Sequence, residues 1–229
     1  MERYGVFAKN PEKTDKVHRT ASSKGFVHDE ENPDFIISLG GDGTFLIAER
    51  EMPGVPKLLV RDSLICFKCH DESLEEMLDM MQEGRGQIVT LPKLKASANG
   101  GSRTAVNDVV VRNRDPRRAL RFRLSVDGEP VDDVLIGDGV IVATPFGSTG
   151  YYRSVTRSRL QEGIGVAFNN LTTGKKPLHL DGDARIEMTI VRSQATLSSD
   201  NHPDVDMLEE GDTVVVSAAD EVARMVGHD

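Results

Sequence analysis

A single carboxylate lies among three glycines in the stretch GGDGT, residues 40–44, directly after the apolar run 35–39. A strand is therefore expected to end here and a helix to begin. Glycines at such a point let backbone N–H groups approach a ligand, and a helix start favours negative charge, so phosphate is the expected ligand. An acid beside phosphate is repelled unless it holds a metal or takes a proton from an attacking hydroxyl. Asp42 is thus a candidate base or metal ligand; the alternative is that it only forms a turn or caps the helix.

A second glycine-bearing segment, GDGVIVATPFGSTGY at 137–151, repeats the order of strand, small-residue turn and helix start. Ser148 and Thr149 offer hydroxyl groups and backbone N–H donors, and Tyr151 offers a flat aromatic face. Such a turn could hold the base and ribose of a nucleotide.

The pair Asn107-Asp108 is the third candidate, because it places an amide and a carboxylate at the start of the apolar run 109–111. The alternative is a turn that only opens a strand. Without the other two segments, that alternative would be the better interpretation, since Asn and Asp are common turn residues.

Cys66 and Cys69 are the only cysteines, and they lie in the sequence CFKCH, which ends at His70. This spelling matches the C-x-x-C-H motif of covalent haem attachment. The setting argues against haem, because we find no export signal and residues 64–67 resemble a strand that enters a core. Zinc would need four ligands, and the segment offers at most three. We therefore expect ordinary buried or half-buried thiols here, without haem or metal.

The elements that must position these residues change in kind near residue 90. Before it, short apolar strands at 4–7 and 35–39 are followed by helical spacing at 73–83. Strands alternating with helices over short connections predict an α/β domain over residues 1–90, which carries GGDGT.

The predicted helix at 73–83 has its own start and stop signals. Ser73 is followed three residues later by Glu76, which is a capping-box pattern, and Gly84 follows the last helical residue.

After residue 90 strand-like runs predominate, and the pairs Asn99-Gly100 and Asp127-Gly128 lie between such runs. These pairs are strong hairpin signals. The sequence therefore predicts that the α/β domain is followed by a β-rich, β-sandwich-like domain over 91–229. The last roughly 15 residues could return to the first domain as a helix or a strand.

The composition limits the partners. Among 229 residues, 37 are acidic and 28 are Lys or Arg, which gives a formal net charge of −9. Binding to nucleic acid without regard to its sequence, or to an anionic membrane, needs a basic face, so we expect no nucleic-acid and no membrane partner. No apolar run reaches the roughly 18 residues of a membrane-spanning helix. We expect a cytoplasmic protein.

In order and spacing, the three candidate segments resemble the NAD kinase family. The family carries GGDGT, an Asn-acid pair, and a motif DG-x6-TPTGSTAY to which GDGVIVATPFGSTGYY at 137–152 is similar. The third motif is highly specific, whereas some lipid kinases and phosphofructokinases carry loops like GGDGT. The resemblance implies an α/β domain, a β domain and an active site between them.

The family transfers a phosphoryl group from ATP, or in some members polyphosphate, to the 2′-hydroxyl of the adenosine ribose of NAD. The resemblance implies that Asp42 is the base that acts on this hydroxyl, and that the donor phosphates lie against Gly40, Gly41, Gly43 and Thr44. It implies Mg²⁺, or Mn²⁺, arriving with the donor rather than in a dedicated protein site. It also implies a homodimer or homotetramer.

The NAD-binding residues implied by the resemblance lie in the second and third segments: Asn107, Asp108, Asp138, Ser148, Thr149, Gly150 and Tyr151. The Asn-acid pair would hold ribose hydroxyls, the residues from 149 to 151 would meet the adenine, and Asp138 would lie near the nicotinamide end.

Two segments depart from the family pattern. Where the family has a loop like GINxGxLGFL, residues 59–67 read LVRDSLICF and keep the aromatic residue without the glycines. Residues 153–180 lack the family's GGP and proline-histidine segments, and Ser199-Asp200-Asn201 is a loose echo of a late DG. The donor and the choice between NAD and NADH stay open. A lipid or sugar kinase, or a non-catalytic dinucleotide-binding protein, are the alternatives.

Overall fold

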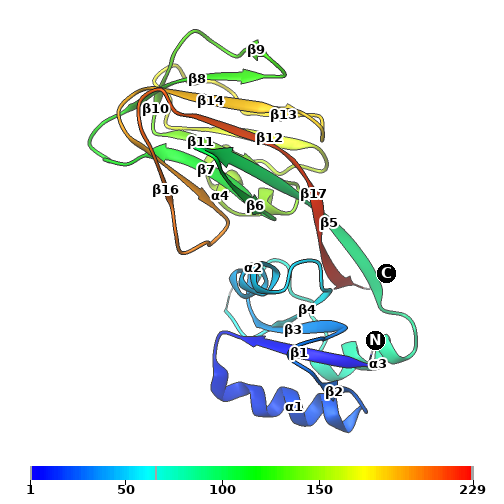
Figure 1. Cartoon of the computed structure of the whole chain (residues 1–229). Helices are drawn as coiled ribbons and strands as arrows, with labels where there is room; N and C mark the ends of the chain where they lie inside the picture. The colour runs from blue at the N-terminus through cyan, green and yellow to red at the C-terminus, as the bar shows by residue number, and fades with distance from the viewer. Residues whose placement is uncertain (1, 65, 228–229) are drawn as a thin grey trace. The chain divides into compact units, whose positions relative to one another are not determined.

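The computed structural model describes residues 2–64 and 66–227 and divides the chain into two compact units (Figure 1). Unit 1 comprises Met1–Leu91 and Val222–Asp229, and unit 2 comprises Pro92–Glu221. The chain leaves unit 1 within strand β5 (Gln87–Ala98) and returns to it within strand β17 (Thr213–Gly227).

Unit 1 is built on a parallel sheet with the strand order β17-β4-β3-β1-β2. Its remaining elements are β1 (Arg3–Ala8), η1 (Pro11–Lys13), α1 (Thr14–Ser23), β2 (Val27–His28), β3 (Phe35–Gly40), α2 (Asp42–Glu51), β4 (Lys57–Arg61) and α3 (Leu74–Gln82). Every residue of β3 is buried, as expected for a parallel strand that is covered on both faces. Figure 1 shows α1 on one side of this sheet and α2 on the other.

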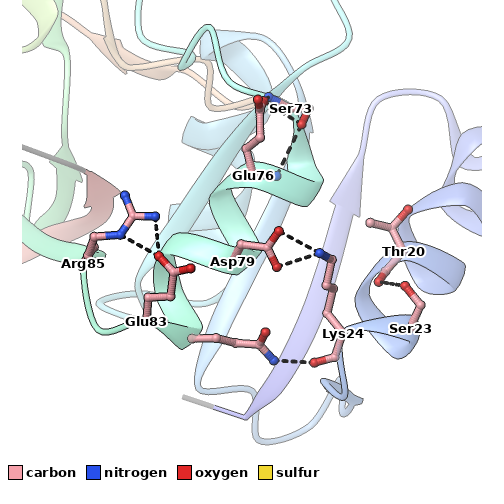
Figure 2. A network of polar contacts seen from close by, with 9 residues as sticks. Thr20, Ser23, Lys24, Ser73, Glu76, Asp79, Glu83 and Arg85 are labelled. Atoms are coloured by element: carbon pink, nitrogen blue, oxygen red, sulfur yellow. Dashed lines mark hydrogen bonds and ion pairs between the residues drawn. The ribbon is translucent and has the colours of Figure 1, made fainter.

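Helices α1 and α3 cover the same face of the sheet. Val17 and Ala21 of α1 and Met77 and Leu78 of α3 share a core cluster with Phe35 and other residues of the strands. Figure 2 shows how polar contacts join the two helices: Lys24 Nζ, just after α1, lies 2.6 and 2.7 Å from the two carboxylate oxygens of Asp79.

The start of α3 confirms the prediction of a capped helix. The N–H of Glu76 donates to Ser73 Oγ over 3.3 Å, and the Glu76 carboxylate accepts the N–H of Ser73 over 2.8 Å (Figure 2). These reciprocal bonds satisfy two backbone donors that the first turn of a helix leaves open.

Unit 2 contains two antiparallel sheets. One has the order β10-β8-β14-β17, with β9 on β8 and β5 joined to both β17 and β6; the other has the order β13-β12-β11-β7-β15-β16. The strands not yet bounded are β6 (Gly101–Ala105), β7 (Asp108–Asn113), β8 (Leu120–Val126), β9 (Glu129–Pro130), β10 (Leu135–Gly137), β11 (Gly139–Ala143), β12 (Ile164–Asn169), β13 (Leu178–Leu180), β14 (Ile186–Arg192), β15 (Ala195–Ser199) and β16 (Asp206–Leu208).

The core of unit 2 lies between the two sheets. Phe122 and Met188 from one sheet pack with Val111 and Val142 from the other in a single buried cluster, which is the β-sandwich-like arrangement expected from the sequence. The other face of the second sheet is covered by the short helix α4 (Tyr151–Thr156), whose Tyr152 is fully buried.

Both hairpin predictions are confirmed. Asn99-Gly100 joins β5 to β6 with φ angles of 50° and 80°, and Asp127-Gly128 joins β8 to β9 with φ angles of 52° and 85°. Positive φ at both central positions matches the twist of paired strands, and Asn, Asp and Gly adopt it most readily.

The expected strand at residues 64–67 is not present among the described residues, so this prediction is wrong. Leu64 is fully exposed and Phe67 is 61% exposed, and neither belongs to a strand. Residue 65 lies outside the described residues. The C-terminal part of β17 is a strand of unit 1, where Met225 pairs with Lys57.

Within the described ranges, no helix is long and apolar enough to cross a membrane.

Candidate active site

The glycine turn of unit 1 joins the end of β3 to the start of α2. Gly40 is the last residue of β3, Gly41 is the N-cap, and Asp42 is the first helical residue. A Cβ atom at Gly40 would lie 2.1 Å from Thr44 Oγ1, so the turn leaves no room for a side chain there. Thr44 is buried and accepts the N–H of Gly41 over 3.4 Å. Gly40 and Thr44 therefore shape the turn, while Gly43 is exposed at its surface.

The carboxylate of Asp42 points away from its own helix and toward the segment after β4. It accepts the N–H of Phe67 at Oδ2 over 3.2 Å and the N–H of Lys68 at Oδ1 over 3.1 Å. Gly41, not Asp42, is the N-cap of α2, so of the two structural alternatives for Asp42 only turn formation remains. Asp42 is half-buried at a helix N-terminus, which is where an acid can meet a bound phosphate.

The expectation of free thiols at Cys66 and Cys69 is wrong, because the two residues form a disulfide with Cα atoms 5.5 Å apart. Cys66 Sγ lies 3.1 Å from Asp42 Oδ1, and Cys69 Sγ lies 3.9 Å from the carbonyl oxygen of Gly40. The spacing of the two cysteines alone did not predict a disulfide, because cysteines three positions apart are also common as metal ligands or free thiols.

His70, the last residue of the CFKCH segment and its third candidate ligand, places Nε2 2.9 Å from the carbonyl oxygen of Val226. No group of three or more His, Cys, Asp or Glu side chains is arranged to hold a metal ion in the part of the chain that the structure describes.

A pocket of about 850 Å³ lies in unit 1 at the carboxyl ends of β3 and β4. Ligands of parallel α/β sheets commonly bind at this edge. Its walls carry Lys16, Arg19 and Arg61, but also six acidic side chains, and none of the predicted site residues lines it. Of these acids, Asp62 has its pKa lowered by a hydrogen bond from Lys13, whose Nζ lies 2.5 Å away.

In unit 2, the Asn107-Asp108 turn is held by a residue about ninety positions later. The Asp200 carboxylate accepts the N–H groups of Val106, Asn107 and Asp108 over 2.8, 2.7 and 3.2 Å. Burial, together with the charge of Asp200, raises the pKa of Asp108 to about 7, and burial also raises the pKa of Asp200. Sequence analysis noted Asp200 only as part of a loose echo and did not select it as a site residue.

The same turn packs against the second glycine segment. The N–H of Thr144 donates to the carbonyl of Asn107 over 3.0 Å, and a Cβ atom at Gly147 would lie 2.0 Å from that oxygen. Gly147 is therefore needed for the close approach of the two segments. The fold thus brings together the Asn107-Asp108 pair and the glycine segment 137–151, which the sequence analysis treated as separate motifs.

Ser148 and Thr149 have different surroundings from those expected of ligand-facing hydroxyls. Ser148 is fully buried, donates to the carbonyl of Pro145 over 2.7 Å and accepts the N–H of Leu160 over 3.0 Å. Thr149 Oγ1 lies 3.4 Å from the carbonyl oxygen of Phe146. Ser148 is engaged within the fold, whereas Thr149 and the neighbouring Gly150 border a surface depression.

Tyr151 and Asp138 each accept a hydrogen bond from one of two consecutive asparagines at the end of β12. Asn169 Nδ2 donates to the hydroxyl of Tyr151 over 3.1 Å, and Asn170 Nδ2 donates to Asp138 Oδ2 over 3.2 Å. Asn113 approaches Asp138 Oδ1 at 3.3 Å. Sequence analysis missed the asparagines, and only their place at strand ends hints at them.

Strand β11 separates the two groups of candidate residues in unit 2. Asp108 pairs with Ala143 at the end of β11, while Asp138 directly precedes its first residue, Gly139. Five residues of extended chain span about 16 Å. Asp108 and Asp138 therefore lie about one strand length apart.

Two features are those of a nucleotide-binding protein. One is a parallel α/β unit with a glycine turn at a helix N-terminus, and the other is a β-sandwich that carries a row of polar groups. The family model for the ATP-NAD kinase C-terminal domain matches residues 106–227. An NAD kinase from Magnetococcus marinus is 31% identical over 212 residues, which cover 86% of this chain and 69% of that protein. The chain belongs to the NAD kinase family.

Solved structures share the fold. An NAD kinase from Archaeoglobus fulgidus, in complex with ATP, has a TM-score of 0.84 at 23% identity and covers 99% of this chain and 94% of its own. A yeast NADH kinase, in complex with NADH, has a TM-score of 0.86 at 19% identity and covers 100% of this chain and 84% of its own.

Proposed function

We propose that this protein transfers a phosphoryl group from ATP to the 2′-hydroxyl of the adenosine ribose of NAD, giving NADP. Membership of the NAD kinase family supports this activity. The observation that carries it is the position of Asp42, an acid directly after a glycine turn at the N-terminus of a helix. ATP and NADH are the ligands named for the solved relatives of the same fold.

Asp42 acts as the general base. A ribose hydroxyl is a poor nucleophile until its proton is accepted, and a carboxylate within hydrogen-bonding reach supplies that acceptor. The oxygen then attacks the terminal phosphorus of ATP, the bond to the bridging oxygen breaks, and ADP leaves. Asp42 carries the ribose proton after the transfer.

The glycine turn positions the donor. The N-terminus of α2, where Gly43 is exposed, favours the negative charge of phosphate because the positive end of the helix dipole lies there. Thr44 acts indirectly, by fixing the conformation of the turn through its contact with Gly41.

Unit 2 supplies the residues that hold NAD. Asn107 is half-buried, and its side chain forms no hydrogen bond with the described residues, so its amide is available for a ribose hydroxyl. Tyr151 presents a half-buried ring for the adenine. Asp138 serves the far end of the dinucleotide, a strand's length from Asp108.

Mg²⁺, or Mn²⁺, accompanies the donor in this proposal. Mg²⁺ keeps several waters and is commonly bound by one or two carboxylates together with substrate phosphates. In this mode the donor phosphates and water would hold the ion, so Asp42 at the glycine turn remains available as the base. The bound ion would neutralise charge on the phosphates.

The deciding experiment measures NADP formation by the purified protein with NAD, Mg²⁺ and either ATP or polyphosphate. We expect NADP with ATP. A protein that is thermally stabilised by NAD but makes no NADP is a dinucleotide-binding protein, and a protein that phosphorylates only a lipid or sugar hydroxyl is a different kinase. Parallel reactions with NADH test the acceptor. Use of polyphosphate, assembly into a homodimer or homotetramer, and a cytoplasmic location stay predictions.

A further inference from the structure

The segment 66–69 lies directly on the proposed base. Three groups of this short segment contact the Asp42 carboxylate: the N–H of Phe67 at 3.2 Å, the N–H of Lys68 at 3.1 Å and Cys66 Sγ at 3.1 Å. The disulfide between Cys66 and Cys69 closes the segment into a small ring. Each oxygen of Asp42 therefore accepts one backbone N–H, and the disulfide sulfur lies against the same carboxylate.

A carboxylate covered in this way is hard for a substrate hydroxyl to reach. Each oxygen keeps a lone pair, but a ribose hydroxyl can use it only if the backbone of Phe67 and Lys68 and the sulfur of Cys66 leave room for its approach. For Asp42 to act on the ribose hydroxyl, the backbone of Phe67 and Lys68 must withdraw from at least one oxygen.

Besides the disulfide, a hydrogen bond from Arg61 Nη2 to the carbonyl of Cys66 over 3.3 Å and the contact of Cys69 Sγ with the carbonyl of Gly40 hold this segment. Phe67 is 61% exposed and Leu64 fully exposed, so their side chains contribute little packing, and only Cys66 is buried. A disulfide between residues three apart closes a short loop, which removes little entropy from the unfolded chain. Its main effect is local, because it fixes the turn that aims two N–H groups at Asp42.

We propose that the Cys66–Cys69 disulfide is a redox switch, which in the oxidised form holds Asp42 out of the reaction and in the reduced form releases it for phosphoryl transfer. This proposal rests on the proposed NAD kinase activity. The reductant is a dithiol.

The reduction balances as an ordinary thiol–disulfide exchange. Cys69 is partly exposed, so a thiolate of the dithiol attacks its sulfur, the S–S bond breaks, and Cys66 leaves as a thiolate and takes up a proton. The second thiolate of the reductant then attacks the mixed disulfide and releases Cys69, which also takes up a proton. The protein gains two electrons and two protons, and the dithiol becomes its own disulfide.

The Cys66 sulfur also works against the closed arrangement after reduction. A thiolate 3.1 Å from the Asp42 carboxylate would place two negative charges in contact, and the neutral thiol is only a weak donor. With the ring open, the disulfide no longer restrains the turn at Phe67 and Lys68 to face Asp42.

The test compares kcat for NADP formation after equilibration with reduced or oxidised dithiothreitol, with thiols counted by maleimide labelling. We expect kcat to be at least about tenfold higher in the reduced form. The double variant Cys66→Ser/Cys69→Ser should match the reduced form under both conditions, and because these are the only cysteines, no other thiol can respond.

A second measurement does not depend on activity. If the disulfide form holds Asp42 more tightly than the dithiol form, then removal of the carboxylate must favour the dithiol by the same factor. Asp42→Asn should therefore shift the disulfide-exchange equilibrium toward the dithiol about tenfold, which is about 30 mV for a two-electron couple. The matched control is Asp183→Asn, an exposed turn residue of unit 2, which should leave the equilibrium unchanged.

Equal kcat in the two forms, with complete conversion of the thiols, overturns the switch and leaves the proposed kinase activity intact. An unchanged equilibrium in Asp42→Asn also overturns it, because the disulfide then has no preference for the bound carboxylate. Absence of NADP from the reduced form, the oxidised form and the double variant instead refutes the proposed kinase activity, and the switch falls with it.

Discussion

Asp42 in unit 1 and the acid pair Asp108 and Asp200 in unit 2 lie at candidate ligand sites, but their surroundings differ. The donors to Asp42 belong to a segment whose Phe67 is 61% exposed. The donors to Asp200 belong to a turn whose Asp108 is only 8% exposed. In the segment that contacts Asp42 only Cys66 is buried, whereas Val106 and Asp108 in the turn held by Asp200 are both buried. Backbone N–H bonds to a carboxylate can thus control chemistry in one place and stabilise architecture in another.

The largest expected effect is the loss of the Asp200 clamp. Asp200→Ala leaves the N–H groups of Val106, Asn107 and Asp108 without their acceptor, so the free energy of unfolding should fall by about 4 kcal/mol. Chemical denaturation measures it, with the exposed Asp183→Ala as control. If the two variants are equally stable, the comparison fails, because Asp200 is then not an architectural residue.

The pH dependence of stability separates the two sites next. Asp108 stays neutral in the folded state up to a pKa of about 7, whereas in the unfolded chain it ionises near the ordinary aspartate pKa of 3.8. The unfolded state therefore binds fewer protons above the lower value, and stability declines as the pH rises toward the upper one. For Asp108 this amounts to about 3 kcal/mol between roughly pH 5 and pH 8.

Asp108→Asn should remove that decline. Denaturation curves at several pH values would show the variant becoming progressively more stable than the parent protein as the pH rises. Parallel stability profiles for the two proteins would mean that Asp108 is ionised in the folded state throughout this range.

At Asp42 the expected effect is on rate rather than stability. Asp42→Asn keeps the size of the side chain but removes the base, so kcat for NADP formation should fall about 100-fold or more, while the melting temperature and NAD affinity change little. Steady-state kinetics with saturating NAD and ATP measures it, with Asp183→Asn as the matched carboxylate-to-amide control. Near-normal turnover in Asp42→Asn would make Asp42 a turn residue.

The smallest expected effect is at Asn107. Its side chain forms no hydrogen bond with the described residues, so Asn107→Ala should leave the apo melting temperature nearly unchanged. Loss of a contact to ribose should weaken NAD binding by about 1 kcal/mol, roughly fivefold in Kd, which calorimetry can measure. A collapsed melting temperature with normal affinity would assign Asn107 to the architecture, together with Asp200.

Features set by neighbouring residues were predictable from the sequence. The hairpin turns Asn99-Gly100 and Asp127-Gly128 and the Ser73–Glu76 capping box each depend on residues within a few positions of one another. The division into α/β and β-rich parts follows from periodicity, which is also local.

Features that join distant residues were not predictable. The clamp by Asp200 reaches back more than ninety residues to Val106, and nothing near Asp200 in the sequence indicates the turn that it holds. The apolar letters at 64–67 suggested a buried strand, but Cys66 turns instead toward Asp42. Helix α1 was not predicted, because only Val17 and Ala21 are buried on an otherwise polar helix.

Gly147 has a consequence for anyone who alters this protein. A Cβ atom at this position would overlap the carbonyl oxygen, carbonyl carbon and Cα of Asn107, at 2.0, 2.3 and 2.4 Å. These are backbone atoms, which cannot move aside as the end of a flexible side chain can. A library that varies residues 107 and 108 to change cofactor preference therefore has to keep glycine at position 147. A substitution of Gly147 would displace Asn107 and weaken ligand binding, although position 147 offers no side chain to a ligand.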